Sequence, residues 1–314
     1  METRITQNAA EAVAWLERGD LVALPTETVY GLAADALNPD AVLRIFEAKE
    51  RPHFDPLIVH LPDLSWLEKV ADSVPEQAQQ LAAAFWPGPF TMVLPRTKLV
   101  PDLVASGLPT VAVRMSVHPV FQEVIEAFGK PLAAPSANRF GRISPTSAAH
   151  VLGELGGRIP LIVDGGNTTH GIESTIVRFG ADGRIEILRS GPVTREMLEG
   201  FGSVGAAGST ASLPVAPGLL KTHYAPVTPM RFLLPDEPPT AYAALLAWCE
   251  PRTGYAACEV LSPAGDLREA AATLFSKMRI LDANGTPLII AEPVPDRGLG
   301  TAIMDRLRKA CGLG

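Results

Sequence analysis

The chain has 314 residues, of which 47% are hydrophobic and 19% are charged, and its formal net charge is −7 at pH 7. This composition excludes extensive disorder, and the length is sufficient for two domains. All apolar runs are shorter than the roughly 18 residues that span a bilayer. The negative charge argues against a protein that binds nucleic acid with its whole surface.

Two further features bear on localisation. Residues 1–20 alternate apolar and charged side chains, which predicts an amphipathic helix and not a secretory signal. Cys249, Cys258 and Cys311 are odd in number and lack the spacing of metal ligands; this is typical of reduced, buried thiols. We therefore expect a cytoplasmic protein without a membrane-spanning segment.

The charge is unevenly distributed along the chain. Residues 1–208 contain 17 Lys and Arg against 24 Asp and Glu, whereas residues 209–314 contain ten of each. An acidic first part that bound an anion would need its cations gathered locally. The basic residues that could do this are Lys49–Arg51, Arg114, Arg139–Arg142 and Arg189.

Helical and extended patterns alternate through the first 200 residues. In chain order they predict a helix at 8–18, a strand at 21–24, a helix at 41–49, a strand at 56–61, a helix at 76–85, strands at 91–95 and 110–114, a helix at 119–128, a strand at 132–134, a helix at 147–155 and a strand at 161–164. Residues 174–179 and 184–188 flank Ala181-Asp182-Gly183 and predict a hairpin. We expect a mixed α/β domain with at least one antiparallel pair.

Residues 202–229 differ in composition from what precedes them. Gly, Ala and Ser dominate first, and several prolines follow, which predicts a linker that begins flexible and becomes stiff. Beyond it, the pattern predicts a strand at 231–234, helices at 241–248 and 270–281, a strand at 287–291 and a helix at 301–309. We therefore divide the chain into a first domain (1–208), a linker (209–230) and a small α/β second domain (231–314).

Two segments near strand ends could bind a ligand. Residues 24–31 read Leu-Pro-Thr-Glu-Thr-Val-Tyr-Gly; their hydroxyls could bond polar atoms, although Thr and Tyr are ordinary strand residues. Lys49 and Arg51 follow a helix and could hold phosphate oxygens, or could merely complement the helix dipole. His60 ends an apolar strand and, taken alone, is typical of a core histidine. His53 and His60 have no companion at metal-ligand spacing, so we assign no metal held by the protein alone.

Residues 131–146 form a third segment of interest. They include Pro135, small hydroxyl and amide side chains and two arginines, so they could contact a nucleotide closely or simply lead into a capped helix. Tyr224 is an aromatic residue within the linker, which indicates that this part of the linker docks onto something. The sequence contains no phosphate-binding P-loop, no dinucleotide-binding glycine motif and no nucleophile elbow.

Taken together and in this order, these segments resemble the threonylcarbamoyl-AMP synthases in their long two-domain form. The resemblance also rests on Trp86–Pro89, Val111–Arg114, Ala134–Asn138, Gly171–Thr175, Leu188-Arg189, His223–Pro226 and Gly298–Arg306. It covers nearly the whole chain and becomes diffuse after residue 230. It implies an open, twisted mixed α/β sheet with helices (YrdC-like) around a concave cavity, followed by a small Rossmann-like α/β domain.

The resemblance also implies two groups of site residues. The threonine site would contain Thr28, His60, Arg114 and Ser174. The ATP site would contain Lys49, Arg51, Asp55, Thr110, Ser136, Ser144, Arg189 and Tyr224. Lys49 and Arg51 would be the catalytic residues, with Lys49 beside the phosphates. Asp55 departs from the family pattern, in which this position is often Asn, and its carboxylate would repel a triphosphate unless it faced magnesium or turned away.

The implied reaction joins L-threonine, bicarbonate and ATP to give threonylcarbamoyl-AMP and pyrophosphate, which makes the chain a nucleotidyltransferase. Mg²⁺ would accompany ATP, and no prosthetic group is expected. The product would pass to a threonylcarbamoyl transferase complex that modifies tRNA; direct contact with tRNA stays open. Catalysis would come from positioning and charge stabilisation, and no general base is identified. Tyr224 is hypothesised to fold over the nucleotide, so that the linker serves as an active-site lid.

Other functions remain as alternatives. The first is an RNA-binding module that uses the concave surface of the first domain, whose affinity would fall steeply with salt. The second is a carbamoyl-transferring domain of metallocentre maturation, although the cysteine pattern of such proteins is missing from this sequence. The second domain could also be only a scaffold.

Overall fold

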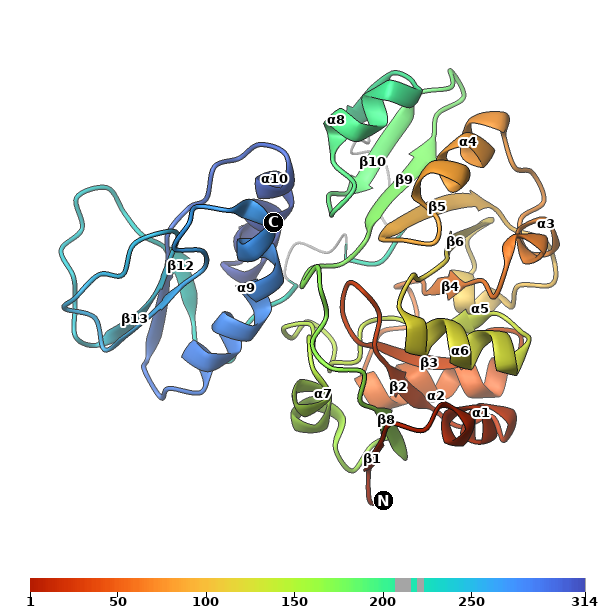
Figure 1. Ribbon diagram of the computed structural model, residues 1–314, viewed down its shortest axis with the longest axis horizontal. Helices are drawn as coiled ribbons and strands as arrows, with labels where there is room; N and C mark the ends of the chain where they lie inside the picture. The colour runs from red at the N-terminus through yellow and green to blue at the C-terminus, as the bar shows by residue number, and fades with distance from the viewer. Residues whose placement is uncertain (207–215, 219–222, 314) are drawn as a thin grey trace.

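The computed structural model describes residues 1–206, 216–218 and 223–313. Parts of the predicted linker, 209–215 and 219–222, lie outside the described residues. Figure 1 shows two domains side by side, with the C-terminal helices of the smaller one facing the larger. The predicted α/β architecture with a smaller α/β second domain is confirmed.

In the described residues, the strands of the larger domain form one sheet of eleven, in the order β1-β8-β2-β3-β7-β4-β6-β5-β9-β10-β11. These strands are β1 (Arg4–Thr6), β2 (Val22–Leu24), β3 (Gly31–Asp35), β4 (Ile58–His60), β5 (Phe90–Pro95), β6 (Thr110–Arg114), β7 (Leu132–Ala133), β8 (Leu161–Val163), β9 (Thr175–Phe179), β10 (Ile185–Arg189) and β11 (Val204–Ala206). Parallel and antiparallel neighbours alternate irregularly, and β9 and β10 form the predicted antiparallel hairpin.

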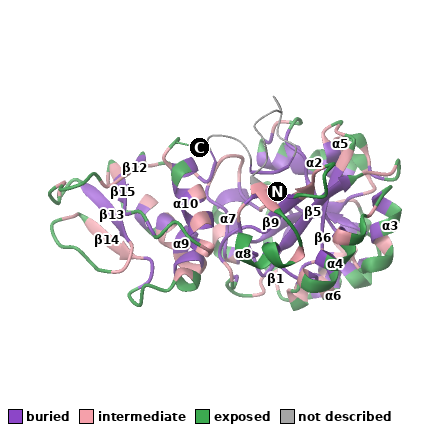
Figure 2. Ribbon diagram, turned by 90° about the horizontal axis from the view of Figure 1, so that it is seen from above, coloured by how far each residue is buried: buried purple, intermediate pink, exposed green. Residues whose placement is uncertain are grey.

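Helices cover this sheet. They are α1 (Ala9–Glu17), α2 (Pro39–Lys49), α3 (Leu67–Val70), α4 (Glu76–Phe85), α5 (Asp102–Ala105), α6 (Pro119–Phe128), α7 (Ala148–Leu155) and α8 (Arg195–Leu198), with short 3-10 turns η1 (Leu64–Trp66) and η2 (Glu199–Phe201). Figure 2 shows the buried strands lying beneath helices whose outer faces are exposed.

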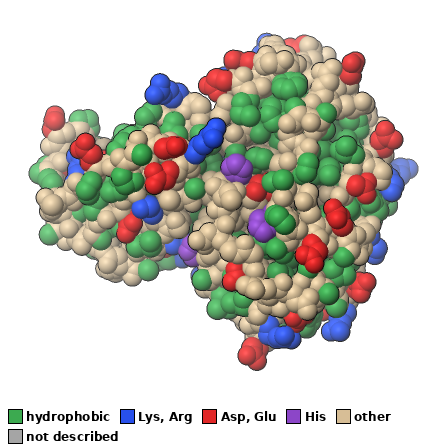
Figure 3. Space-filling view, viewed as in Figure 1, with side chains coloured by type: hydrophobic (Ala, Val, Ile, Leu, Met, Phe, Trp, Pro, Cys, Tyr) green, Lys and Arg blue, Asp and Glu red, His purple; other side chains and the backbone are tan. Residues whose placement is uncertain are grey.

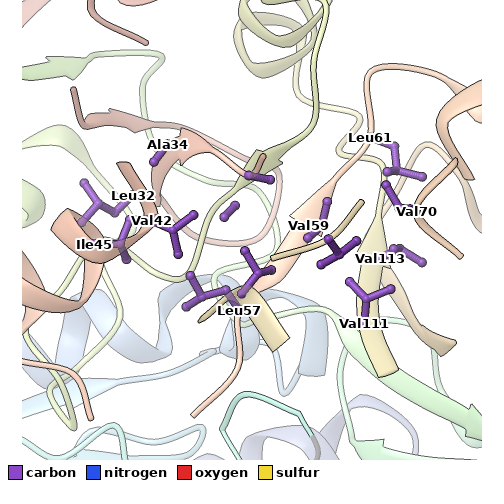
Figure 4. Packing of buried hydrophobic residues seen from close by; sticks show 14 of the residues in the cluster. Leu32, Ala34, Val42, Ile45, Leu57, Val59, Leu61, Val70, Val111 and Val113 are labelled. Atoms are coloured by element: carbon purple, nitrogen blue, oxygen red, sulfur yellow. The ribbon is translucent and has the colours of Figure 1, made fainter. Parts of the chain in front are cut away.

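Helix α2 positions the first cationic segment. It begins after Asn38, whose side chain accepts hydrogen bonds from two backbone amides, and Pro39 occupies its first turn. Its apolar face, which includes Val42 and Ile45, packs with residues of β3, β4 and β6 in the main core (Figure 4). The helix ends at Lys49, and Glu50 follows in a left-handed conformation. Packing of this one face therefore fixes the position of Lys49 and of the residues that follow it.

The second domain has a parallel sheet with the order β12-β15-β13-β14. Its elements are β12 (Met230–Phe232), β13 (Ala243–Ala247), β14 (Ala257–Val260), α9 (Leu267–Asp282), β15 (Leu288–Ala291) and α10 (Leu299–Ala310). The helices pack in one apolar cluster that also contains residues of the larger domain, Val29 and Ile172 among them. The two domains therefore share a continuous core.

Among the described helices, none has the length and apolarity that crossing a membrane requires.

The predicted helix at 241–248 is wrong. Residues Ala243–Ala247 form strand β13, which lies between β15 and β14 and is buried along its whole length. A strand covered on both faces reads as a continuous apolar run, and this one consists of Ala and Leu, which favour helices. Tertiary burial therefore overrides local propensity at this segment. Strands β1, β3, β11 and β14 were not predicted.

Gly171 allows the larger domain to approach α9 closely. Its φ is +69°, and a Cβ at this position would lie 2.5 Å from the Cα of Ala272. Gly183, in the hairpin turn, has a similar φ of +76° but no atom within 4 Å of the corresponding point.

We predict that Gly171→Ala lowers the free energy of unfolding by about 2–4 kcal/mol, because backbone strain and a clash with α9 add. The matched variant Gly183→Ala has the strain alone and should lose only about 1 kcal/mol. Denaturant unfolding of both variants measures the difference, and equal losses would contradict the close packing of α9 on Gly171.

Candidate active site

A cavity lies in the larger domain where its strand ends meet the linker. Its walls come from parts of the chain that are far apart in the sequence, between Thr26 and Tyr224. The lining residues are Thr26, Thr28, Val29, Gly31, Arg51, Ile58, His60, Arg114, Ala134, Pro135, Ser136, Glu173, Arg189, Pro217, Gly218, His223 and Tyr224.

The structure brings most of the sequence-predicted site residues to this cavity. Those that line it are Thr28, Arg51, His60, Arg114, Ser136, Arg189 and Tyr224. Four others each contact a lining residue from behind: Lys49, Asp55, Ser144 and Ser174. Thr110 is not among the lining residues. It is the first residue of β6 and pairs with Pro95, whereas Arg114, which lines the cavity, is the last residue of the same strand.

Three buried guanidinium groups face the cavity from different elements. Arg51 follows α2, Arg114 ends β6 and Arg189 ends β10, and each is at most 6% exposed. Burial lowers the pKa of Arg51 and of Arg189, but arginine stays protonated in proteins. A small cavity with these cations in its wall is suited to a ligand with several negative groups.

Each of these arginines is oriented by partners in the protein. Arg189 donates to the backbone oxygen and the hydroxyl of Ser174, at 3.0 Å each. The hydroxyl of Ser174 is in turn 2.8 Å from that of Thr91, on β5. Ser174 therefore supports the cavity through Arg189 in this structure.

Glu27 is a buried acid that contacts the cavity wall through Arg114, and the sequence alone did not assign it. Its carboxylate pairs with Arg114 at 2.6 Å and accepts a hydrogen bond from Ser116 at 2.5 Å. Burial opposes ionisation of Glu27, but Arg114 and Ser116 outweigh it and its pKa stays below the usual value. Glu27 lies within the segment 24–31, and the acid between two threonines was the signal that could have identified it.

His60 enters the cavity as a neutral imidazole. It ends β4, is 2% exposed, and neither ring nitrogen has a hydrogen-bond partner in the described chain. Burial and then the charge of Arg114 lower its pKa to about 3. The ring can therefore offer one acceptor and one donor to a ligand at neutral pH.

Lys49 acts from behind the cavity wall. Its Nζ donates to the backbone oxygens of Ser136 and Asn138, at 2.5 Å each. Burial, followed by the charge of Arg51, holds the pKa of Lys49 well below its usual range. The two bonds tie the end of α2 to the loop after β7, which places Ser136 in the wall.

Asp55 turns towards the protein and not towards the cavity. It is completely buried and pairs with Arg51 at 2.8 Å. Burial raises its pKa, although Arg51 and Lys49 oppose this. The carboxylate thus balances the charge of the buried Arg51, which explains how an acid is accommodated at this position.

The described part of the linker closes one side of the cavity. Ala225 donates to the backbone oxygen of Gly141, which anchors this segment on the loop after β7. His223 and Tyr224 are buried, and their rings lie 4.1 Å apart. Tyr224 has a φ of +62°, which is uncommon for a residue with a large side chain.

Among the described residues, no group of three or more His, Cys, Asp or Glu side chains could hold a metal.

Comparison with known proteins identifies the family. A family model described as telomere recombination matches residues 14–191, and a model of the threonylcarbamoyl-AMP synthase C-terminal domain matches residues 193–312. The chain belongs to the threonylcarbamoyl-AMP synthase family. The threonylcarbamoyl-AMP synthases of Pyrococcus abyssi and Bacillus subtilis are each 41% identical to it over 96% of this chain, covering 93% and 92% of their own lengths.

Solved structures agree with this family membership. The crystal structure of P. abyssi Sua5 complexed with L-threonine has a TM-score of 0.90 and 36% identity, and covers 100% of this chain and 98% of the other. Escherichia coli YciO covers 60% of this chain with a TM-score of 0.52 and 22% identity, so it shares the fold of the first domain. The long two-domain form of the threonylcarbamoyl-AMP synthase family therefore accounts for the whole chain.

We predict that Asp55→Asn lowers the free energy of unfolding by about 3 kcal/mol or more, because it leaves Arg51 buried without its countercharge. Asp20→Asn is the matched control: Asp20 pairs with Arg44 at 2.6 Å, but at the surface, so its loss should cost less than about 1 kcal/mol. Thermal and denaturant unfolding test the pair, and similar losses in both variants would contradict this role of Asp55.

Proposed function

We propose that this chain joins L-threonine, bicarbonate and ATP to give threonylcarbamoyl-AMP and pyrophosphate, and so acts as a nucleotidyltransferase. The observation that carries the proposal is the cavity itself: three buried arginines and a neutral histidine surround one small space in a member of the threonylcarbamoyl-AMP synthase family. Cations suit the substrate carboxylate and phosphates, and the neutral ring suits an amine.

In the proposed complex, threonine occupies the part of the cavity near Arg114. The guanidinium would bind the carboxylate, while Thr28 and His60 would contact the hydroxyl and the amine. The neutral amine attacks the carbon of bicarbonate; a nitrogen–carbon bond forms, water leaves, and a carbamate results. The positive surroundings favour loss of the ammonium proton, which the attack requires.

The nucleotide would occupy the part near Arg51, Ser136, Arg189 and Tyr224. A carbamate oxygen attacks the α-phosphorus, the bond to the β-phosphate oxygen breaks, and pyrophosphate leaves. The arginines would stabilise charge on the phosphates, and no covalent bond to the enzyme forms. Mg²⁺ is proposed to enter with ATP, held by phosphate oxygens and water, since Asp55 and Glu173 are already paired with arginines.

We further propose that the product serves a threonylcarbamoyl transferase complex that modifies tRNA. The alternative of an RNA-binding module has less support. On the face seen in Figure 3, acidic and basic side chains are interspersed, and the arginines of the cavity are buried. A protein that tracks a phosphate backbone needs exposed cations gathered in one groove.

The reaction predicts that purified protein releases pyrophosphate from ATP only when threonine and bicarbonate are both present. A mass corresponding to threonylcarbamoyl-adenylate should appear in the same mixture. Omission of each substrate in turn provides the control. Release without bicarbonate would indicate simple amino-acid activation, and salt-sensitive RNA binding without any release would favour the binding module.

The low pKa of His60 predicts a pH profile. With a pKa of about 3 the imidazole is neutral from pH 5 to pH 9, so it should produce no inflection of kcat/KM for threonine in this range. His60→Gln should lower kcat/KM by about tenfold or more through lost hydrogen bonds, while the shape of the profile stays the same. An acidic limb between pH 5 and 7 that disappeared in His60→Gln would show that the ring titrates in this range.

A further inference from the structure

Arg306 connects the second domain to the cavity. It lies on α10 and has no exposed surface, although it carries a charge. Its Nε donates to the carboxylate of Glu173 at 2.9 Å, and Nη1 donates to the backbone oxygen of Ser190 at 2.9 Å. Both acceptors belong to the larger domain. Nη1 also donates to Asp305, next to it in the chain.

Glu173 transmits this contact to the cavity wall. It lines the cavity, and its second carboxylate oxygen accepts a hydrogen bond from Ser144 at 2.5 Å. Burial opposes its ionisation, but Arg306 and Arg189 outweigh this, so its pKa stays below the usual value. The carboxylate is therefore held as an anion between the two domains, with Arg306 as its ion-pair partner.

Tyr224 is held between two side chains of the second domain. The guanidinium of Arg306 lies 5.1 Å from the centroid of its ring, and Phe275, on α9, stacks at 5.6 Å with an angle of 27° between the rings. These contacts offset the unfavourable positive φ of Tyr224. The tyrosine hydroxyl is buried and has no hydrogen-bond partner in the described chain.

The same helix supports the neighbouring wall. Lys309, one turn after Arg306, donates to the backbone oxygen of Gly218 at 2.9 Å. Gly218 lines the cavity, and a Cβ at this position would lie 2.6 Å from the hydroxyl of Tyr224. One face of α10 thus contacts both described parts of the linker that reach the cavity.

We propose that Arg306 is a positioning residue of the nucleotide site, and that the second domain completes this site by holding Tyr224 and Glu173 without touching the ligand itself. This inference rests on the proposed function only in taking the ligand to be ATP. A guanidinium can hold both Glu173 and Tyr224, because its edge donates hydrogen bonds to a carboxylate while its face stacks on an aromatic ring. Lysine keeps the charge but can do neither in the same way.

The test measures ATP and threonine affinity separately, by calorimetry, in Arg306→Lys and Phe275→Leu. ATP should bind about tenfold more weakly in each variant, because the wall formed by Tyr224 is no longer held in place. The dissociation constant for threonine should stay within about twofold, because Arg114 and His60 do not contact Arg306. Arg308→Lys is the matched control, since Arg308 lies on the same helix but is half-exposed and pairs with Asp296; its ATP affinity should not change.

A double variant distinguishes loss of the positioning role of Arg306 from a general loss of structure. In a Tyr224→Ala background, Arg306→Lys should weaken ATP binding by much less than tenfold, because the ring that it holds is gone. Unchanged ATP affinity in folded Arg306→Lys, or equal losses of ATP and threonine affinity, would overturn the proposal. Because binding is measured without turnover, failure of wild-type protein to release pyrophosphate would count against the proposed function and not against this inference.

Discussion

Placing several cations in the interior is the constraint on which this structure depends. A buried charge is costly unless a countercharge and hydrogen bonds accompany it. The ion pairs that supply a countercharge around the cavity are Arg51–Asp55, Arg114–Glu27 and Arg306–Glu173. Two of them join segments far apart in the chain, so the ion pairs also define how these segments meet. The outcome is a cavity whose cations are already oriented before any ligand arrives, which is what catalysis by positioning requires.

The sheet brings these groups together because several of its strands end at the same place. His60 and Arg114 end the neighbouring parallel strands β4 and β6 and lie opposite each other in the ladder. Arg189 ends β10, whose partner β9 begins directly after Ser174. Helix α2 adds Arg51 from the side. The apolar faces of these short strands and of the helix form the core. Packing of the core therefore fixes the positions of the polar residues at their ends, which are not part of the core themselves.

The second domain is part of this arrangement and not an appendage. Its helices share an apolar cluster with Val29, Ile172 and Tyr224, and α10 adds a charged contact within that cluster. An interface that is both apolar and charge-paired restricts how the domains can move relative to each other. The linker residues that reach the cavity are held on the surface of α9 and α10, so the geometry of the site depends on both domains.

The sequence by itself determined the α/β class, the order of most helices and strands of the first domain, and the family, because periodic apolar patterns and several motifs in order carry that information locally. It did not reveal that residues 243–247 form a strand, since Ala and Leu favour a helix until neighbours cover both faces of the segment. It also did not assign Glu27, Glu173 or Arg306, whose roles arise only from partners distant in the chain. Charge pairing and burial are properties of the assembled core, and for that reason only the tertiary structure decided which acid balances which arginine.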